Sequence, residues 1–301
     1  MVEVKEIWPL FKVAFSEWRK DKAVRLGASL SFYTVFSLPP LLVIAVAIAG
    51  IYYGEEASRG RIVQQFRGLL GDQGAQMIQT MILQAGNLKA GIIATLVGVA
   101  VLLAGATAVF VDLQDALNAV WKVKPKPKSS LIYLVKIRAL SLLVALGTGF
   151  LLLVSLIVST LISAFGDYLN QLWPGPPILL YLLRGDELLF SFGMITILFA
   201  MLYKVLPDAE IAWRDVWLGA AFTALFFTFG KFLIGLYLGK SRIGSTFGAT
   251  GSLAILLLWI YYHSLVFLFG AEFTRVFANT YGSKIKPKES ATDTTELEST
   301  E

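Results

Sequence analysis

The chain has 301 residues, of which 56% are hydrophobic and only 16% are charged, and its mean hydropathy is +0.68. Because a soluble domain carries about 25% charged residues, this composition argues against an ordinary soluble domain and indicates a membrane protein. The absence of cysteine excludes disulfide bonds and thiolate metal sites.

The chain begins with a charged segment in which aromatic residues recur at spacings of three, four and three: Trp8, Phe11, Phe15 and Trp18. This spacing predicts a helix with one aromatic face. We expect residues 1–25 to form a cytoplasmic amphipathic helix at the membrane interface. The alternative is that the same face packs against the rest of the protein. A long apolar run follows, so we expect no cleavable signal peptide here.

Six stretches contain no Asp, Glu, Lys or Arg: residues 26–54, 90–111, 139–166, 188–203, 216–230 and 243–271. A transmembrane helix needs roughly 20 mostly apolar residues, and four stretches meet that length unaided. The other two can extend, 188–203 backward through 178–183 and 216–230 forward through 232–239. Continuous apolar runs favour helices over a membrane β-barrel. We therefore predict an all-α, polytopic membrane helical bundle of about six transmembrane helices within residues 26–280.

The first predicted span contains Pro39 and Pro40. Proline inside a helix removes a backbone hydrogen bond and clashes with the preceding turn, so we expect this helix to kink or break there. Outside the spans, residues 55–88 carry two apolar groups separated by the turn-forming residues 71–74. They predict an external amphipathic loop of two short helices. The polar residues 281–301 predict a disordered cytoplasmic tail.

The basic residues predict the orientation. Counted by the loops between the predicted spans, 18 Lys and Arg residues lie on one side and 8 on the other. Cytoplasmic loops are the ones enriched in Lys and Arg, so we place both termini in the cytoplasm. The net charge of +5 then matches anionic lipid headgroups. Nucleic acid explains it less well, because the basic residues do not lie in a folded soluble domain.

Polar residues at the ends of two predicted helices are candidates for a substrate path. Asp112, Asp115 and Asn118 recur every three residues where the second span ends. The last helix adds three more residues, His263, Glu272 and Arg275, of which the final two can pair at this spacing. Ionisable groups near membrane depth are costly and suggest function. Helix capping and interfacial ion pairing are the alternative for each residue alone.

Glycine residues mark places where helices can approach closely. Gly244, Gly248 and Gly251 open the last predicted span, and the first two have the four-residue spacing of close helix contacts. Close packing is the expected use of this turn, and a broken helix at a substrate site is the alternative.

Four segments resemble the YihY/BrkB family of bacterial inner-membrane proteins: residues 25–39, 110–121, 202–220 and 247–272. The likeness covers roughly residues 8–280. It implies a six-helix protein of the bacterial inner membrane without a settled biochemical activity, for which transport of a lipid or another amphipathic solute is suspected. Some members of the family carry an old label, ribonuclease BN.

The residues argue against that ribonuclease label. Phosphodiester cleavage usually needs paired histidines or a carboxylate-bound metal near a basic groove, and this chain has a single histidine. We expect no catalytic activity, metal or cofactor. Two function classes remain: a transporter of a lipid-like or other amphipathic solute, and a non-catalytic envelope scaffold. The expected partners are membrane lipids, and a homo-oligomer or an envelope-protein partner is possible, but nucleic acid is not expected.

Overall fold

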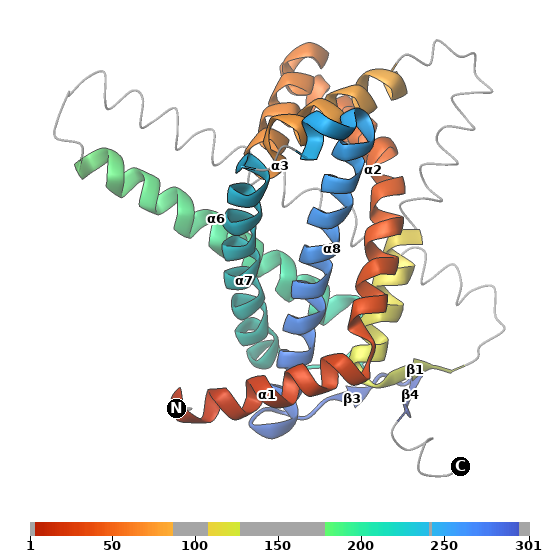
Figure 1. The fold of residues 1–301 in the computed structure, drawn as a ribbon. Coiled ribbons are helices and arrows are strands. Elements are labelled where there is room, and N and C mark those ends of the chain that lie inside the picture. Colours follow the sequence, from red (N-terminus) through yellow and green to blue (C-terminus); the bar gives the residue numbers. More distant parts are fainter. Residues whose placement is uncertain (1–3, 87–107, 127–177, 241–242, 295–301) are drawn as a thin grey trace. The chain divides into compact units, whose positions relative to one another are not determined.

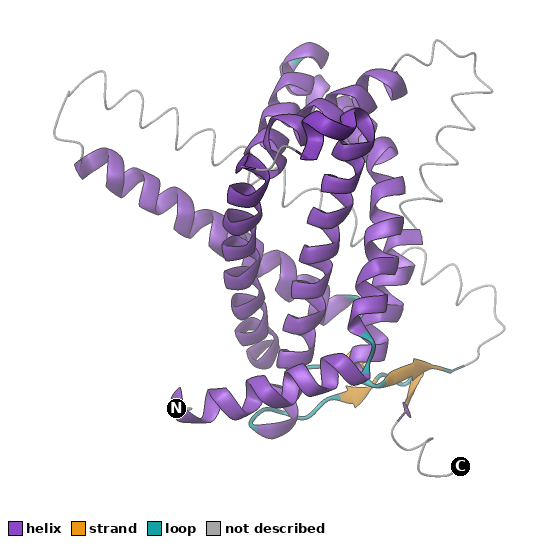
Figure 2. Ribbon diagram, viewed as in Figure 1, coloured by secondary structure: helices purple, strands orange, loops and turns teal. Residues whose placement is uncertain are grey.

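The structure, a computed structural model, describes residues 4–86, 108–126, 178–240 and 243–294. Helices dominate these residues (Figure 2), as expected for an all-α protein. The predicted span 139–166 and most of the span 90–111 lie outside them. The chain divides into two compact units, each described by itself. Unit 1 comprises Met1–Phe15, Leu117–Phe226 and Gly270–Glu301, and unit 2 comprises Ser16–Ala116 and Phe227–Phe269.

The N-terminal segment forms helix α1 (Val4–Lys20), as predicted from its aromatic spacing. The aromatic residues divide between the two interpretations of this helix. Phe11 packs in unit 1 against Phe222 and Phe273, with ring centroids 4.9 and 5.3 Å away. Trp8 and Phe15 are 66% and 51% exposed, respectively. Part of the face therefore packs against the protein, and an interfacial position for the exposed part stays a prediction.

Helix α2 (Ala23–Tyr53) continues through Pro39 and Pro40 without interruption, so the predicted break does not occur. Membrane helices tolerate proline when the groups around it satisfy the freed backbone. The flanking residues are almost all apolar, so both halves of the helix favour the same environment. A bend of the helix axis stays a prediction.

Helix α3 (Glu55–Gly86) is a single helix, so the predicted turn at residues 71–74 is wrong. Each glycine inside a helix costs about 1 kcal/mol relative to alanine. The two halves offset this cost by packing on one core: Ile62 from the first half and Ile78 and Ile82 from the second contact the same cluster. The external position predicted for residues 55–88 stays a prediction.

The core of unit 2 joins three helices, α2, α3 and α8 (Ile243–Thr280). Its buried residues lie four or seven positions apart on each helix, the spacing of one helical face. They are Val35, Leu42, Val46, Ile78, Ile82, Leu256 and Ile260. Within a bilayer such a core is held by van der Waals packing rather than by removal of apolar surface from water.

Three later spans are helical over the predicted ranges and their extensions. Helix α6 (Ile178–Val205) begins where the backward extension of span 188–203 was expected, and α7 (Trp213–Lys240) includes the whole forward extension of span 216–230. Among the described residues, one segment is long and apolar enough to cross a membrane, Leu253–Thr280 of α8, and Leu189–Val205 is a shorter apolar segment. Six spans and the positions of the termini stay predictions.

The residues after α8 are ordered up to Thr294, so the prediction of a disordered tail is wrong for residues 281–294. Strand β3 (Lys286–Pro287) pairs with β2 (Ala209–Glu210), and β4 (Ala291–Asp293) pairs with β1 (Val123–Pro125), both antiparallel. Composition alone predicted disorder because few apolar residues are present. Backbone hydrogen bonds to two distant loops hold the segment instead. Figure 1 shows β1, β3 and β4 together.

Candidate functional site

The predicted site residue Asn118 joins a buried polar pair in unit 1. It lies in the last turn of the helix over residues 108–121. Its Nδ2 donates to Asp208 Oδ2 (3.0 Å), and the backbone N–H of Asp208 donates to its Oδ1 (2.8 Å). Asn118 and Asp208 are 4% and 9% exposed. The amide thus fixes the loop after α6 to the end of a helix about 90 residues earlier in the chain.

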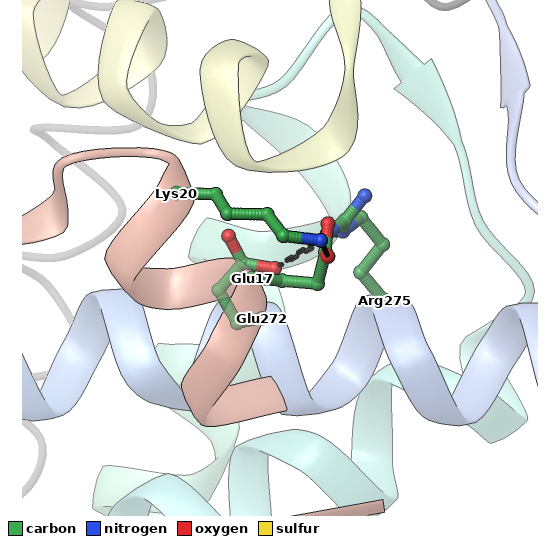
Figure 3. A network of polar contacts seen from close by, with 4 residues as sticks. All are labelled: Glu17, Lys20, Glu272 and Arg275. Atoms are coloured by element: carbon green, nitrogen blue, oxygen red, sulfur yellow. Dashed lines mark hydrogen bonds and ion pairs between the residues drawn. The ribbon is translucent and has the colours of Figure 1, made fainter. Parts of the chain in front are cut away.

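Glu272 and Arg275 form an ion pair on α8, as their spacing predicted. The Nε and Nη2 atoms of Arg275 lie 3.1 and 3.0 Å from Glu272 Oε2 (Figure 3). The glutamate is wholly buried and the arginine is 8% exposed. Figure 3 also shows a second pair at the same spacing on α1, Glu17 with Lys20, whose side chains are 23% and 68% exposed. Since desolvation costs several kcal/mol per ion, the buried pair is far more demanding than the exposed one.

Asp112 lies in unit 2, one residue beyond its predicted uncharged span. Ser29 Oγ of α2 donates to Asp112 Oδ1 at 3.0 Å. Burial raises the pKa of Asp112, and the hydrogen bond from Ser29 opposes that rise. The carboxyl group is therefore easier to protonate than an exposed aspartate. Asp115, one turn further along, is exposed.

His263 lies in unit 2 among aromatic rings. Its ring centroid is 4.1 Å from that of Trp259 and 4.2 Å from that of Phe227. His263 Nδ1 lies 2.7 Å from the backbone oxygen of Trp259. A carbonyl oxygen only accepts hydrogen bonds, so Nδ1 carries the proton. Among the residues that the structure describes, no three His, Asp or Glu side chains lie close enough to hold a metal ion.

A close contact between α7 and α8 in unit 1 was not predicted. Each helix contributes a glycine and a threonine four residues apart, Gly219 with Thr223 and Gly270 with Thr274. A Cβ added to Gly219 would lie 2.7 Å from Thr274 Cβ, and one added to Gly270 would lie 2.8 Å from Thr223 Cβ. The two helices run side by side in Figure 1, and the contact is reciprocal, as expected for antiparallel helices. We call this contact the glycine–threonine seam.

Tyr203 of α6 joins the seam, because its hydroxyl lies 3.0 Å from Thr223 Oγ1. Both side chains are wholly buried. Small residues at four-residue spacing mark this contact in the sequence, and the similar pattern near residue 244 is the one from which close packing was predicted. Gly244, Gly248 and Gly251 lie in the first turns of α8, and their surroundings are outside what the structure describes.

The six predicted polar residues divide between the two units. Unit 1 holds Asn118, Glu272 and Arg275, and unit 2 holds Asp112, Asp115 and His263. A continuous polar path through all six stays a prediction. Asp208 was not among the predicted site residues. A buried amide needs a hydrogen-bond partner, so a buried Asn118 implies one, but the sequence does not say which residue it is.

Comparison with known proteins places the chain in a family. The family model described as virulence factor BrkB matches residues 14–295. A UPF0761 membrane protein of Verminephrobacter eiseniae is 30% identical over 265 residues, covering 85% of this chain and 59% of that protein. A UPF0761 membrane protein of Pseudoalteromonas translucida is 30% identical over 257 residues, covering 84% of this chain and 81% of that protein.

A UPF0761 membrane protein of Pseudomonas aeruginosa is 29% identical over 260 residues, covering 83% of this chain and 58% of that protein. The chain spans about three-fifths of the length of the first relatives that it matches. No solved structure matches it. The names of these bacterial relatives specify a membrane protein and no reaction. The match over residues 14–295 shows that the chain is a membrane protein of the YihY/BrkB family.

Proposed function

We propose that this protein is a multi-pass protein of the bacterial inner membrane that translocates a lipid-like or other amphipathic solute. The observation that carries the proposal is the buried pair of Glu272 and Arg275 on α8, within the segment apolar enough to cross a membrane. An ionisable pair at such a position is expensive to bury. Function is a better reason to keep it there than stability, because apolar residues would pack in the same place at lower cost.

The pair suggests how a headgroup is recognised. Arginine presents a planar fork of donors that matches a phosphate or a carboxylate. In the structure Glu272 occupies part of that fork through Nε and Nη2. An anionic headgroup would compete with Glu272 for Arg275, and the displaced carboxylate would then need a proton or another partner. Exchange of partners at one guanidinium lets a polar headgroup enter an apolar segment while Arg275 itself stays paired.

A scaffold function is the second candidate, and the glycine–threonine seam favours it. At Gly219 and Gly270 the threonine side chain of the opposite helix lies too close to the glycine to admit a methyl group without movement. Helices locked in this way resist sliding past each other. A transporter whose moving parts include this part of unit 1 would have to open the seam or move it as one body.

The proposal is tested by flux measurements in liposomes that contain the purified protein and fluorescent phospholipids. We expect wild-type flux above that of empty vesicles. Glu272→Gln and Arg275→Lys should lower it about tenfold, because each removes one charge-assisted interaction of about 1.4 kcal/mol. Glu210→Gln is the matched control, since Glu210 is an exposed carboxylate of the same type.

Each variant is first compared with wild type by thermal unfolding, so that loss of flux is not confused with loss of folding. Phospholipid flux no higher than that of empty vesicles would favour the scaffold. Equal flux in wild type, Glu272→Gln and Arg275→Lys would remove these two residues from the path.

A further inference from the structure

The segment after α8 is fixed in place by two loops of unit 1. We call β1, β2, β3, β4 and their adjoining residues the C-terminal clasp. Beyond the strand pairs, the backbone N–H of Lys126 donates to Ser290 O (2.8 Å), that of Lys288 to Asp208 O (3.0 Å), and that of Thr294 to Lys122 O (2.9 Å). Side chains carried by the clasp are therefore held at fixed positions.

The clasp concentrates positive charge. The four strands and their adjoining residues 122–126, 209–210 and 281–294 contain six lysines and three acidic residues, Glu210, Glu289 and Asp293, which leaves three positive charges. Four of the lysines are exposed: Lys124, Lys126, Lys284 and Lys286. Lys288 is turned inward, and its Nζ donates to Pro207 O at 2.6 Å. The exposed four form the outward-facing charge of the clasp, although Lys126 Nζ also donates to Glu289 O at 3.1 Å, and we call them the clasp lysines.

With α8 across a membrane, these lysines would lie close to the bilayer surface. The apolar segment of α8 ends at Thr280, and Lys284 and Lys286 follow four and six residues later. The β1–β4 pairing ties Lys124 and Lys126 to the same segment. Basic clusters directly after a transmembrane helix lie within the attraction of anionic headgroups.

The backbone conformation of some lysines suggests that their positive charge has a function. Among the described residues, the non-glycine residues with positive φ are all lysines: Lys22 (54°), Lys122 (57°) and Lys284 (59°). Lys22 and Lys122 come within two residues of a helix end, where glycine or asparagine normally occupies this conformation, and Lys284 lies in the loop four residues after α8. A lysine there accepts backbone strain, so its side chain contributes something that glycine does not. A helix C-terminus attracts positive charge, and so does an anionic lipid surface.

We propose that the clasp lysines bind the headgroups of anionic phospholipids. A fixed set of ammonium groups next to the end of an apolar helix matches a layer of phosphate groups in charge and in position. This role depends on the membrane position of α8 and not on transport, so it can succeed or fail separately from the proposed function.

The test uses the full-length protein in neutral detergent micelles, titrated with micelle-dissolved phosphatidylglycerol or phosphatidylcholine, with binding followed by native mass spectrometry. Lys284→Asn removes a charge at a position where asparagine tolerates the backbone, and Lys286→Gln removes its neighbour. Together they should weaken phosphatidylglycerol binding about thirtyfold at low salt, since each lysine near a membrane surface contributes about fivefold. Phosphatidylcholine binding should not change.

Lys124→Gln with Lys126→Gln is a second variant, at positions without backbone strain, and should show a loss of the same size. Arg61→Gln with Arg67→Gln removes the same charge from exposed positions on α3 and is the matched control. The proposal is overturned if both clasp variants bind phosphatidylglycerol as wild type does. It is also overturned if the control loses as much affinity as the clasp variants, because the effect would then reflect net charge alone.

Discussion

Gly270→Ala tests the glycine–threonine seam most sharply. The added Cβ would lie 2.7 Å from the Tyr203 hydroxyl and 2.8 Å from Thr223 Cβ, and it would overlap Thr223 Oγ1. Tyr203 and Thr223 are both wholly buried. Neither side chain can move outward into solvent to make room. Overpacking by one methyl group in such a place costs about 1–3 kcal/mol, and we expect Gly270→Ala to lower stability by that amount.

Gly193→Ala on α6 is the matched control, because a Cβ at Gly193 meets no atom within 4 Å. Alanine is favoured over glycine inside a helix by about 1 kcal/mol, so this variant should be neutral or more stable. The measurement is thermal or denaturant unfolding of the purified protein in detergent. The opposite signs of the two changes separate a steric effect from a general response to replacing glycine.

Thr223→Ala provides a second control through a double-mutant cycle with Gly270→Ala. Alone it removes the hydrogen bond to Tyr203, which we expect to cost about 0.6–1 kcal/mol. Combined with Gly270→Ala it removes the overlapping hydroxyl, so the double variant should be more stable than the sum of the two single changes predicts. The seam is not packed as described if Gly270→Ala has the same unfolding midpoint as wild type. The same conclusion follows if the free-energy changes of the two single variants add up to that of the double variant.

Four further variants, one of them a double replacement, test the polar groups. Arg275→Ala should lower the free energy of unfolding by about 3–5 kcal/mol, because it leaves the buried Glu272 carboxylate without its partner. Replacing both residues with methionine should restore most of that stability in an unfolding assay. Asn118→Ala should cost about 1–3 kcal/mol in the same assay, since it leaves buried groups of Asp208 without their amide partner. Asp112→Asn should be neutral or stabilising at pH 7. Burial raises the folded-state pKa of Asp112 above its ordinary 3.8. Wild-type stability therefore falls as pH rises from 3.8 through the raised folded-state pKa. Asparagine does not titrate, so the pH dependence of unfolding should be flatter in the variant.

The helical content could be predicted from the sequence, because long uncharged runs leave few other structures for a chain in a bilayer. The extensions of α6 and α7 were also predictable, since the predicted spans were too short and apolar residues lay next to them. The same local reasoning failed at residues 71–74. Glycines there suggested a turn, but packing of both halves of α3 on one core outweighed the local preference.

The polar contacts were predictable only where both partners lie on one helix. Glu272 and Arg275 are three residues apart, so their pairing follows from helix geometry. Asn118 and Asp208 are 90 residues apart, and only the fold brings them together. The clasp could not be predicted from the sequence for the same reason, because its paired strands lie far apart in the chain. Residues 281–294 have the composition of a disordered tail and are ordered by strand partners that no local pattern reveals.

The proposed function requires that the protein crosses the membrane several times, and the predicted orientation puts the clasp in the cytoplasm. The absence of native cysteine makes single-cysteine labelling in intact cells the most direct test. Gln76→Cys on α3 and Lys126→Cys beside β1 are suitable because both positions are exposed, whereas the neighbouring Ala75 is buried. The predicted orientation requires that a membrane-impermeant thiol reagent labels position 76 in intact cells and position 126 only after the cells are opened. Labelling of both positions, or of position 126 alone, in intact cells would contradict it.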